Sequence, residues 1–484
     1  MFLGIDIGTS GVKAVVLDTH GAVVGQGVAA LSVQRPYPLW SEQDPEDWWK
    51  ATSAAVLAID PQVRRAVRGI GLAGQMHGAT LLGADDRPLR PAILWNDGRS
   101  FAECAALEAT TPEFRTLGGN IVMPGFTAPK LEWVRRHEPE IFAQVATVLL
   151  PKDYVRLRMT GEKASDMSDS AGTLWLDVGG RRWSDTLLAA CGLTQAQMPR
   201  LVEGTDVAGV LRADIAEAWG IAQVPVAGGA GDNAGGAAGV GVVTDGKALL
   251  SLGTSGVIFV ANDQFRPNPA RAVHAFCHCL PEMWHQMSVH LSAASCIDWV
   301  ARLTGASGAA EVFQRAEAAG VASGPEIFLP YLSGERTPHN DAQVRGAFVG
   351  LDNDTDPNRL AQAVLEGVAF ALADGLDVLR EAGTEVAELA VIGGGARSRY
   401  WGETLAAAME VPLVYLQGGE VGPALGAARL AQIAVDGGTP AEVCVAPPVS
   451  HRIAPDAELT ARLAPKKAVF RAAYAKISPL THSN

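Results

Sequence analysis

One carboxylate and one carboxamide stand out in a stretch that is otherwise almost bare of side chains. Residues 227–241 contain seven glycines and five alanines around Asp232 and Asn233. Fixing glycine costs conformational entropy, so this density indicates that the backbone closely approaches a ligand or another segment. Residues 224–226 are predicted to end a strand, and residues 233–243 to form a helix. A carboxylate at this junction could face a ligand, and capping of the helix is the alternative.

The same four-residue turn occurs twice, about half a chain apart. Residues 4–16 and 249–260 both consist of an apolar run, the sequence Gly-Thr-Ser-Gly and a second apolar run. Such a link predicts a hairpin whose turn exposes backbone amides and hydroxyl groups. A repeat at this spacing predicts two similar domains, residues 1–244 and 245–484, whose turns face each other.

Two polar loops follow predicted strands in the first half. Strand 67–73 leads into a loop with Met76 and His77, and strand 92–95 ends at Trp95. Ligands in α/β proteins bind at the carboxyl ends of strands, so both loops are candidates for one pocket. Ordinary surface turns are the alternative for each.

A glycine turn in the second half suggests contact with a nucleotide. The buried-strand pattern of residues 387–392 leads into Gly394, Gly395 and Ala396. Between a strand and a helix, such a turn lets phosphates or a flat base lie against backbone amides. The spacing matches neither the dinucleotide fingerprint nor the lysine-terminated phosphate loop.

A group of histidines and cysteines raises the question of a metal site. His274, Cys277, His278 and Cys279 lie close together, with His285 and His290 nearby. Their spacing fits no structural zinc pattern. In the alternating stretch 272–280 we interpret them as strand residues on both faces, with metal binding as the less favoured hypothesis.

Composition narrows the class of protein. The 484 residues allow two to four domains, and 48% apolar content is enough for two full cores. A net charge of −13 argues against nucleic acid or an anionic membrane as the main partner. The six cysteines are scattered, and no apolar run reaches the roughly 18–20 residues that span a bilayer. We expect a soluble, cytoplasmic protein.

Taken together, the motifs resemble those of the FGGY carbohydrate kinases over essentially the whole chain. The resemblance rests on the segments 6–10, 125–134, 231–233, 253–255, 346–351, 366–367 and 393–396. One departure is Arg359, where the family usually has an acid, amide or histidine. The resemblance implies an α/β fold of two actin/Hsp70/sugar-kinase-like (ribonuclease H-like) domains with a ligand cleft between them. Residues 1–244 would bind the sugar and part of the phosphates, and residues 245–484 would bind ATP.

The resemblance also implies roles for individual residues. Asp232 would be the general base, and Asp6 would face it across the cleft, the two holding Mg²⁺ through water. The sugar would contact Met76, His77, Trp95, Asp232 and Asn233. ATP would contact Thr9, Ser10, Lys13, Gly253, Thr254, Ser255, Gly394, Gly395 and Ala396.

Within the family, several loops resemble those of members that phosphorylate D-xylulose to D-xylulose 5-phosphate. Glycerol kinases have an Arg-Glu pair in place of Met76 and His77, which disfavours glycerol. A sugar acid such as gluconate would favour a basic side chain in the pocket, for which Arg99 and Lys152 are the candidates. Ribulose stays open, as does a conformational ATPase of the actin or Hsp70 type. A homodimer is possible.

Overall fold

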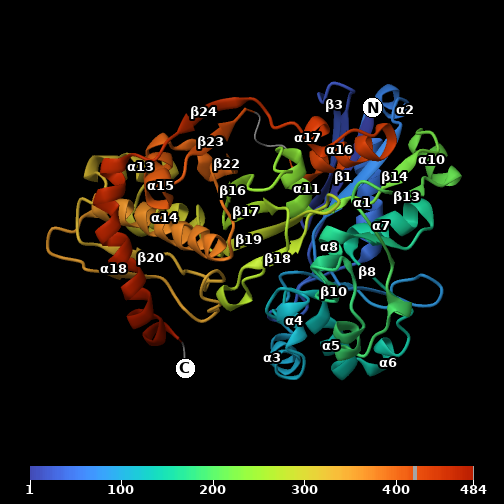
Figure 1. Ribbon diagram of the computed structural model, residues 1–484, viewed down its shortest axis with the longest axis horizontal. Coiled ribbons are helices and arrows are strands. Elements are labelled where there is room, and N and C mark those ends of the chain that lie inside the picture. Colours follow the sequence, from blue (N-terminus) through green and yellow to red (C-terminus); the bar gives the residue numbers. More distant parts are fainter. Residues whose placement is uncertain (418–421, 483–484) are drawn as a thin grey trace.

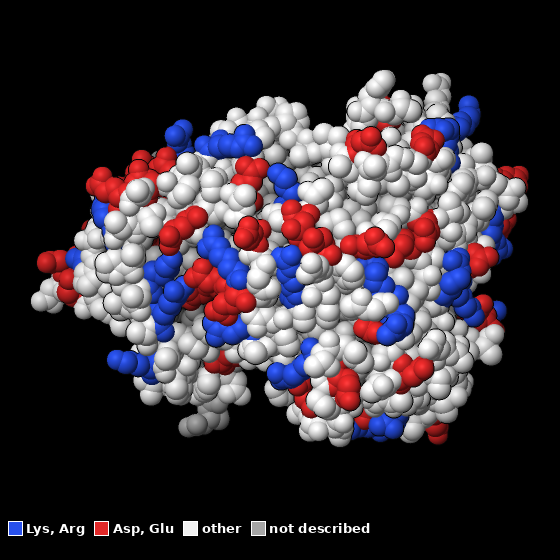
Figure 2. Space-filling view, in the orientation of Figure 1, with Lys and Arg blue, Asp and Glu red and all other residues white. Residues whose placement is uncertain are grey.

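The chain folds into two lobes, each built on a seven-stranded sheet (Figure 1). The computed structural model describes residues 1–417 and 422–482, apart from the side chains of residues 396 and 397. Within these residues, every helix is too short or too polar to cross a membrane. The face in Figure 2 shows basic side chains interspersed with acidic ones, and its outline is indented between the lobes.

The sheet of the first lobe has the order β13-β14-β5-β1-β2-β3, with β15 beside β5. Strands β1, β2 and β3 form an antiparallel meander that includes the hairpin predicted at residues 4–16, and β5 and β14 then add parallel to β1. The strands are β1 (Phe2–Ile7), β2 (Gly11–Leu17), β3 (Val23–Ala30), β5 (Gly69–Gly74), β13 (Val207–Val210), β14 (Pro225–Ala227) and β15 (Ala230–Gly231).

The sheet of the second lobe has the order β18-β19-β17-β16-β22-β23-β24. Strands β16, β17 and β19 repeat the antiparallel meander, and β22 and β23 repeat the two parallel additions. The two sheets therefore share the repeated topology predicted from the two Gly-Thr-Ser-Gly turns, while the domain bounds 1–244 and 245–484 stay a prediction. The strands are β16 (Ala248–Leu252), β17 (Gly256–Asn262), β18 (His274–Cys277), β19 (Trp284–His290), β22 (Leu389–Ile392), β23 (Leu413–Leu416) and β24 (Val449–Ile453).

Helices and short strand pairs surround the two sheets. The helices are α1 (Pro45–Leu57), α2 (Pro61–Arg65), α3 (Phe101–Thr110), α4 (Glu113–Thr116), α5 (Thr127–His137), α6 (Pro139–Phe142), α7 (Pro151–Thr160), α8 (Met167–Ala171), α9 (Asp185–Ala190), α10 (Ala213–Trp219), α11 (Asp232–Gly239), α12 (Ser295–Thr304), α13 (Ala309–Ala319), α14 (Pro357–Glu381), α15 (Arg399–Met409), α16 (Pro423–Asp436), α17 (Pro440–Val443) and α18 (Ala457–Thr481). The 3₁₀ turns are η1 (Gln195–Gln197), η2 (Pro269–Arg271) and η3 (Gly394–Arg397). The strand pairs are β4 (Glu42–Gln43) with β7 (Ala92–Ile93), β6 (Thr80–Leu82) with β8 (Thr147–Leu149), β9 (Ala164–Asp166) with β12 (Arg200–Val202), β10 (Leu176–Asp177) with β11 (Arg182–Trp183), and β20 (Ile327–Leu329) with β21 (Ala347–Val349).

The strand predicted at residues 92–95 differs from the structure. Only the two residues of β7 are extended, and they pair with β4 outside the seven-stranded sheet. The chain turns away because the Asp97 carboxylate accepts hydrogen bonds from the backbone amides of Ser41 and Arg99, at 2.6 and 2.9 Å. A short apolar run indicates burial but does not say which sheet it joins.

Helix α16 comes from the second half of the sequence but packs on the sheet of the first lobe (Figure 1). A Cβ atom on Gly71 of β5 would lie 1.9 Å from the Ala427 carbonyl oxygen. A Cβ on Gly426 would lie 1.8 Å from the Gly235 carbonyl oxygen of α11. These glycines are required by close approach, and the small residues around Asp232 serve partly to pack α11 against α16.

A group of fully buried charged side chains lies behind the junction of β15 and α11. The Lys152 Nζ is 2.7 to 2.8 Å from carboxylate oxygens of Asp153, Asp166 and Asp169. Burial alone would lower the pKa of Lys152, but the three carboxylates raise it. Burial and the neighbouring carboxylates hold the pKa of Asp169 well above its usual range.

We expect Lys152→Met to destabilise the protein by about 3–5 kcal/mol, because it leaves the buried carboxylates of Asp166 and Asp169 without their cation. The measurement is the shift in melting temperature by scanning calorimetry, at about 2–4 °C per kcal/mol. The matched control is Lys50→Met, since the Lys50 side chain is 70% exposed and pairs with Asp47 on the surface. Equal melting temperatures for the two variants would contradict the expectation.

Candidate active site

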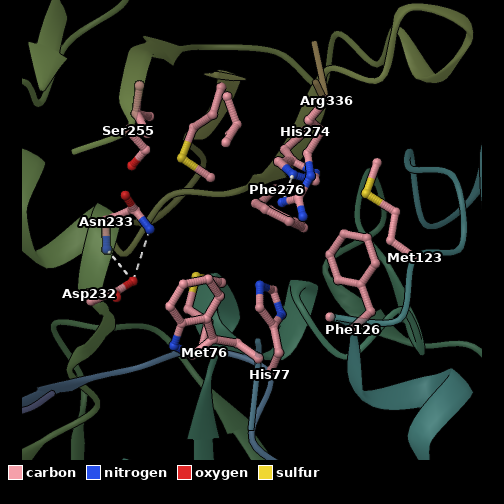
Figure 3. Close-up of a pocket in the computed structure, with 15 residues that line it drawn as sticks. Met76, His77, Met123, Phe126, Asp232, Asn233, Ser255, His274, Phe276 and Arg336 are labelled. Atoms are coloured by element: carbon pink, nitrogen blue, oxygen red, sulfur yellow. Dashed lines mark hydrogen bonds between the residues drawn. The ribbon is translucent and has the colours of Figure 1, made fainter. Parts of the chain in front are cut away.

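A cavity of about 210 Å³ lies where the lobes meet (Figure 3). Its size suits a small polar molecule better than a drug-sized one. Both halves of the sequence contribute to its wall, which consists of Met76, His77, Trp95, Met123, Gly125, Phe126, Asp232, Asn233, Ser255, Val257, His274, Phe276, Met287, Val289 and Arg336. All five residues predicted to contact the sugar are among them.

Asp232 is the first residue of α11 and faces this cavity. Gly231 occupies the N-cap position and α11 has no side-chain cap, so the capping alternative for Asp232 does not hold. One carboxylate oxygen, Oδ1, accepts hydrogen bonds from the backbone and side-chain amides of Asn233, at 2.7 and 2.9 Å. The other oxygen, Oδ2, has no hydrogen-bond partner among the described residues and is available to a ligand. Burial raises the pKa of Asp232 to about 6, against the opposing effect of the Asn233 hydrogen bonds.

Asp6 lies near the end of β1, in register with Ala73 of β5 and hence with Ala230 of β15. Burial, with the charge of Asp232, raises the pKa of Asp6 to about 7, and Lys13 on the adjacent strand opposes this. Among the described residues, the buried Asp6 Oδ1 has no hydrogen-bond partner. Two close carboxylates with an unsatisfied oxygen form a site that suits a hard cation.

The two Gly-Thr-Ser-Gly turns differ in how many of their hydroxyl groups already make hydrogen bonds within the protein. The Thr9 hydroxyl donates to Gln75 Oε1 and accepts from the Trp95 ring N–H, both at 2.9 Å. Ser10, Thr254 and Ser255 are exposed, while Gly253 is partly exposed and donates its amide to the Ser255 carbonyl. The second turn therefore has the freer hydroxyl groups.

His77 is held in one tautomer by its surroundings. Its Nδ1 lies 2.7 Å from the carbonyl oxygen of Gly172, so Nδ1 must carry the hydrogen. Burial, helped by the Lys130 charge, lowers the pKa of His77 to about 3, so the ring is neutral. The Nε2 atom is then a pure acceptor for a ligand hydroxyl. Met76 packs beside it against Gly231.

The predicted nucleotide turn forms the 3₁₀ turn η3, directly after β22. Gly393 has φ of +97°, and a Cβ there would lie 2.7 Å from the Leu252 carbonyl oxygen at the end of β16. The backbone of Gly394 and Gly395 therefore lies beside the second Gly-Thr-Ser-Gly turn. The side chain of Ala396 lies outside the described part of the structure.

Most of the histidines and cysteines considered for a metal make other polar contacts, whereas the ring nitrogens of His285 have no hydrogen-bond partner among the described residues. His274 contacts Asn120 and Arg336, and His278 Nε2 lies 3.1 Å from the Val242 carbonyl oxygen. The thiol of Cys277 donates to the Val178 carbonyl. Within residues 1–417 and 422–482, no three His, Cys, Asp or Glu side chains are grouped in a way that could hold a metal.

The basic residue of the cavity wall differs from the two that the sequence suggested. Arg99 and Lys152 were the candidates, and neither lines the cavity. The side chain of Arg99 is 1% exposed and pairs with Asp97 and Glu42 at 2.6 and 2.7 Å, while Lys152 is buried in its own carboxylate cluster. Arg336, from the loop after β20, is the cation in the wall.

Comparisons with known proteins agree with this architecture. The N-terminal domain of the FGGY family of carbohydrate kinases matches residues 1–239, and its C-terminal domain matches residues 248–435. The chain is 55% identical to xylulose kinase of Escherichia coli strain K12, over 99% of this chain and 100% of the relative. It is 53% identical to that of Klebsiella pneumoniae, with the same coverage.

A crystal structure of a xyloylose kinase from Brucella ovis superposes with a TM-score of 0.96, at 52% identity and 99% coverage of both chains. The two matching domains span both lobes, and the cavity between those lobes holds the predicted base. The chain therefore belongs to the FGGY family of carbohydrate kinases.

Proposed function

We propose that the protein transfers the γ-phosphoryl group of ATP to the terminal hydroxyl of D-xylulose, forming D-xylulose 5-phosphate and ADP. The observation that carries this proposal is Asp232, whose free carboxylate oxygen faces a small cavity lined by both lobes. Full-length relatives at 53–55% identity are xylulose kinases, which supports this substrate over other sugars.

Asp232 acts as the general base in this proposal. The C5 hydroxyl oxygen forms a bond to the γ-phosphorus while the bond from that phosphorus to the ADP oxygen breaks, and the hydroxyl proton passes to Asp232. Phosphoryl transfer passes through a loose transition state, so the base is needed late and mainly holds the hydroxyl in line. The Asn233 hydrogen bonds fix the carboxylate for this task.

Asp6 and Asp232 would hold Mg²⁺, in part through water. The fit rests on the unsatisfied Oδ1 of Asp6 and on the repulsion between the two carboxylates, which a cation would relieve. Bound there, Mg²⁺ would neutralise charge on the ATP phosphates. Lys13, opposite Asp6 on β2, would add a positive charge beside the same phosphates.

The two turns, with Ser10 in one lobe and Thr254 and Ser255 in the other, would bind the β- and γ-phosphates from opposite sides. The η3 turn with Gly394, Gly395 and Ala396 would support the adenosine. In this proposal residues 1–244 and 245–484 act as two domains that close over the sugar and exclude water. A homodimer and a cytoplasmic location stay predictions.

Arg336 favours one competing hypothesis, a sugar acid as the acceptor, because a cavity cation could pair with a carboxylate.

We expect wild-type enzyme with Mg-ATP to show its highest kcat/KM for D-xylulose among D-xylulose, D-ribulose, glycerol and D-gluconate, measured by ADP release. Asp232→Ala should lower kcat by about 10²–10⁴-fold. The control is Asp354→Ala, an exposed carboxylate away from the cavity.

A higher kcat/KM for D-gluconate would overturn the proposed substrate. ADP release that no sugar stimulates would favour the conformational ATPase instead.

The pKa values of Asp6 and Asp232 predict how activity depends on pH. Both side chains must be ionised to act, so kcat/KM should rise as the pH increases through about 6 to 7 and then level off. Saturating Mg²⁺ should move the rise to lower pH, because a cation favours the ionised carboxylates. A flat profile between pH 5 and 8 would contradict this assignment.

The same values predict that Asp6 costs stability in the ligand-free protein. Its folded-state pKa of about 7 lies above the ordinary value of 3.8, so ionisation destabilises the fold progressively as the pH rises from about 4 to 7. Asp6→Asn should therefore raise the melting temperature, more at pH 8 than at pH 5, while abolishing activity. The gain at pH 8 should be at least about 2–4 °C, the shift for 1 kcal/mol. Asp354→Asn is the control, and a loss of stability at pH 8 would refute the prediction.

A further inference from the structure

The guanidinium of Arg336 has no carboxylate partner among the described residues. Its side-chain hydrogen bond runs from Nη1 to His274 Nε2, at 3.3 Å. The neighbouring Glu335 is engaged elsewhere: its carboxylate accepts from the backbone amides of Leu291 and Arg336 and contacts His290. A partly buried cation without an anion is costly, so a ligand that accepts its hydrogen bonds would be strongly favoured.

His274 holds this guanidinium in place from behind. The Asn120 side-chain amide donates to the Gly118 and Ala275 carbonyls at 2.8 and 3.0 Å, which fixes its Oδ1 as an acceptor. His274 Nδ1 lies 3.1 Å from that oxygen and so carries the hydrogen. Its Nε2 lone pair then accepts from Arg336. Burial and the Arg336 charge hold the pKa of His274 well below its usual range, so this arrangement is stable at neutral pH.

Arg336 and Asp232 lie on different sides of the cavity. In Figure 3 the Arg336 guanidinium reaches in from the second lobe beside His274 and Phe276, whereas Asp232 lies at the opposite end next to Asn233. A sugar whose reacting hydroxyl contacts Asp232 therefore extends its other end toward Arg336.

The chemistry of a ketopentose makes that other end distinctive. A pentulose closes into a furanose by adding its C5 hydroxyl to the C2 ketone. The C5 hydroxyl is therefore free for phosphorylation in the open-chain form, where C2 carries a carbonyl. That oxygen accepts hydrogen bonds but donates none, and a guanidinium donates but does not accept. Within the cavity, His77 Nε2 is an acceptor and therefore suits a sugar hydroxyl rather than the carbonyl.

We propose that Arg336 binds the C2 carbonyl oxygen of the open-chain ketose and so determines specificity for a ketose over a polyol. The inference rests on the proposed function and deepens it. His274, with Asn120 behind it, is a positioning residue for the guanidinium.

The test compares D-xylulose with xylitol, the polyol obtained when the C2 carbonyl is reduced. Loss of a charged hydrogen bond to the carbonyl is expected to lower kcat/KM for D-xylulose by about 10–100-fold in Arg336→Met, mainly through KM. The kcat/KM for xylitol should fall by a smaller factor, because its C2 hydroxyl can accept from the guanidinium but its hydroxyl hydrogen finds no acceptor there. The ketose-to-polyol preference of the wild type therefore collapses in the variant.

Two further variants make the result specific. Arg336→Lys keeps the charge without the planar fork and should lose part of the preference. If Arg336→Met fails to fold, as a melting-temperature measurement would reveal, Arg336→Lys replaces it in the comparison. His274→Phe should reduce the same preference, mainly through a higher KM for D-xylulose, because the guanidinium loses the acceptor that positions it. The control is Arg345→Met, on the same loop but exposed and outside the cavity.

The outcomes separate the two proposals. Wild-type enzyme that does not phosphorylate D-xylulose overturns both. Wild-type enzyme that does so, with an Arg336→Met variant that keeps its preference or loses both substrates equally, overturns the role of Arg336 and leaves the proposed function standing.

Discussion

The structure depends on keeping two carboxylates close together in partly buried positions. Asp6 lies near the end of β1 and Asp232 directly follows β15, and strand β5 between them fixes their spacing through its register with both strands. Burial raises both pKa values toward neutrality, and the charge of Asp232 adds to the shift of Asp6, so the rest of the fold must offset a cost in stability. The glycine-faced packing of α11 on α16 offsets part of it and ties the second half of the sequence to the first lobe. The fold thus holds in place the two carboxylates whose charge the proposed phosphoryl transfer requires.

The backbone that carries Asp232 is held from behind by other polar groups. The Gly231 amide donates to the Ser168 hydroxyl at 3.0 Å, and Arg156 donates to the carbonyls of Ala227 and Gly228 at 2.7 and 2.5 Å. Ser168 is in turn hydrogen-bonded to Asp166, which pairs with Lys152. The buried charges therefore fix the strand end from which Asp232 projects, although none of them reaches the cavity. A rigid support of this kind is what positions a base to fractions of an ångström.

The sequence revealed those features that depend on local pattern. The repeated turn predicted the repeated sheet, and the bare stretch around Asp232 predicted close approach, because glycine density has a direct backbone meaning. Arg336 could not be identified this way. It reaches the cavity from a loop about a hundred residues after Asp232, and its significance lies in lacking a carboxylate partner among the described residues, which depends on tertiary packing. By sequence alone, Arg99 and Lys152 were equally plausible as the basic residue of the cavity. In the folded protein, each side chain instead forms ion pairs with carboxylates outside the cavity.

The polarity of the cavity bears on which hydroxyl reacts. D-xylulose has primary hydroxyl groups at both C1 and C5, so a catalyst must distinguish its two ends. With the sugar reversed, the carbonyl oxygen at C2 would approach the carboxylate of Asp232. Two hydrogen-bond acceptors would then face each other without a hydrogen between them. In the proposed orientation the carbonyl would accept from Arg336 and the C5 hydroxyl would donate to Asp232, while His77 Nε2 would accept from a hydroxyl between them. One anion and one cation at opposite ends of a small cavity are thus enough to orient a neutral substrate, and a mismatched end leaves a buried polar group unpaired.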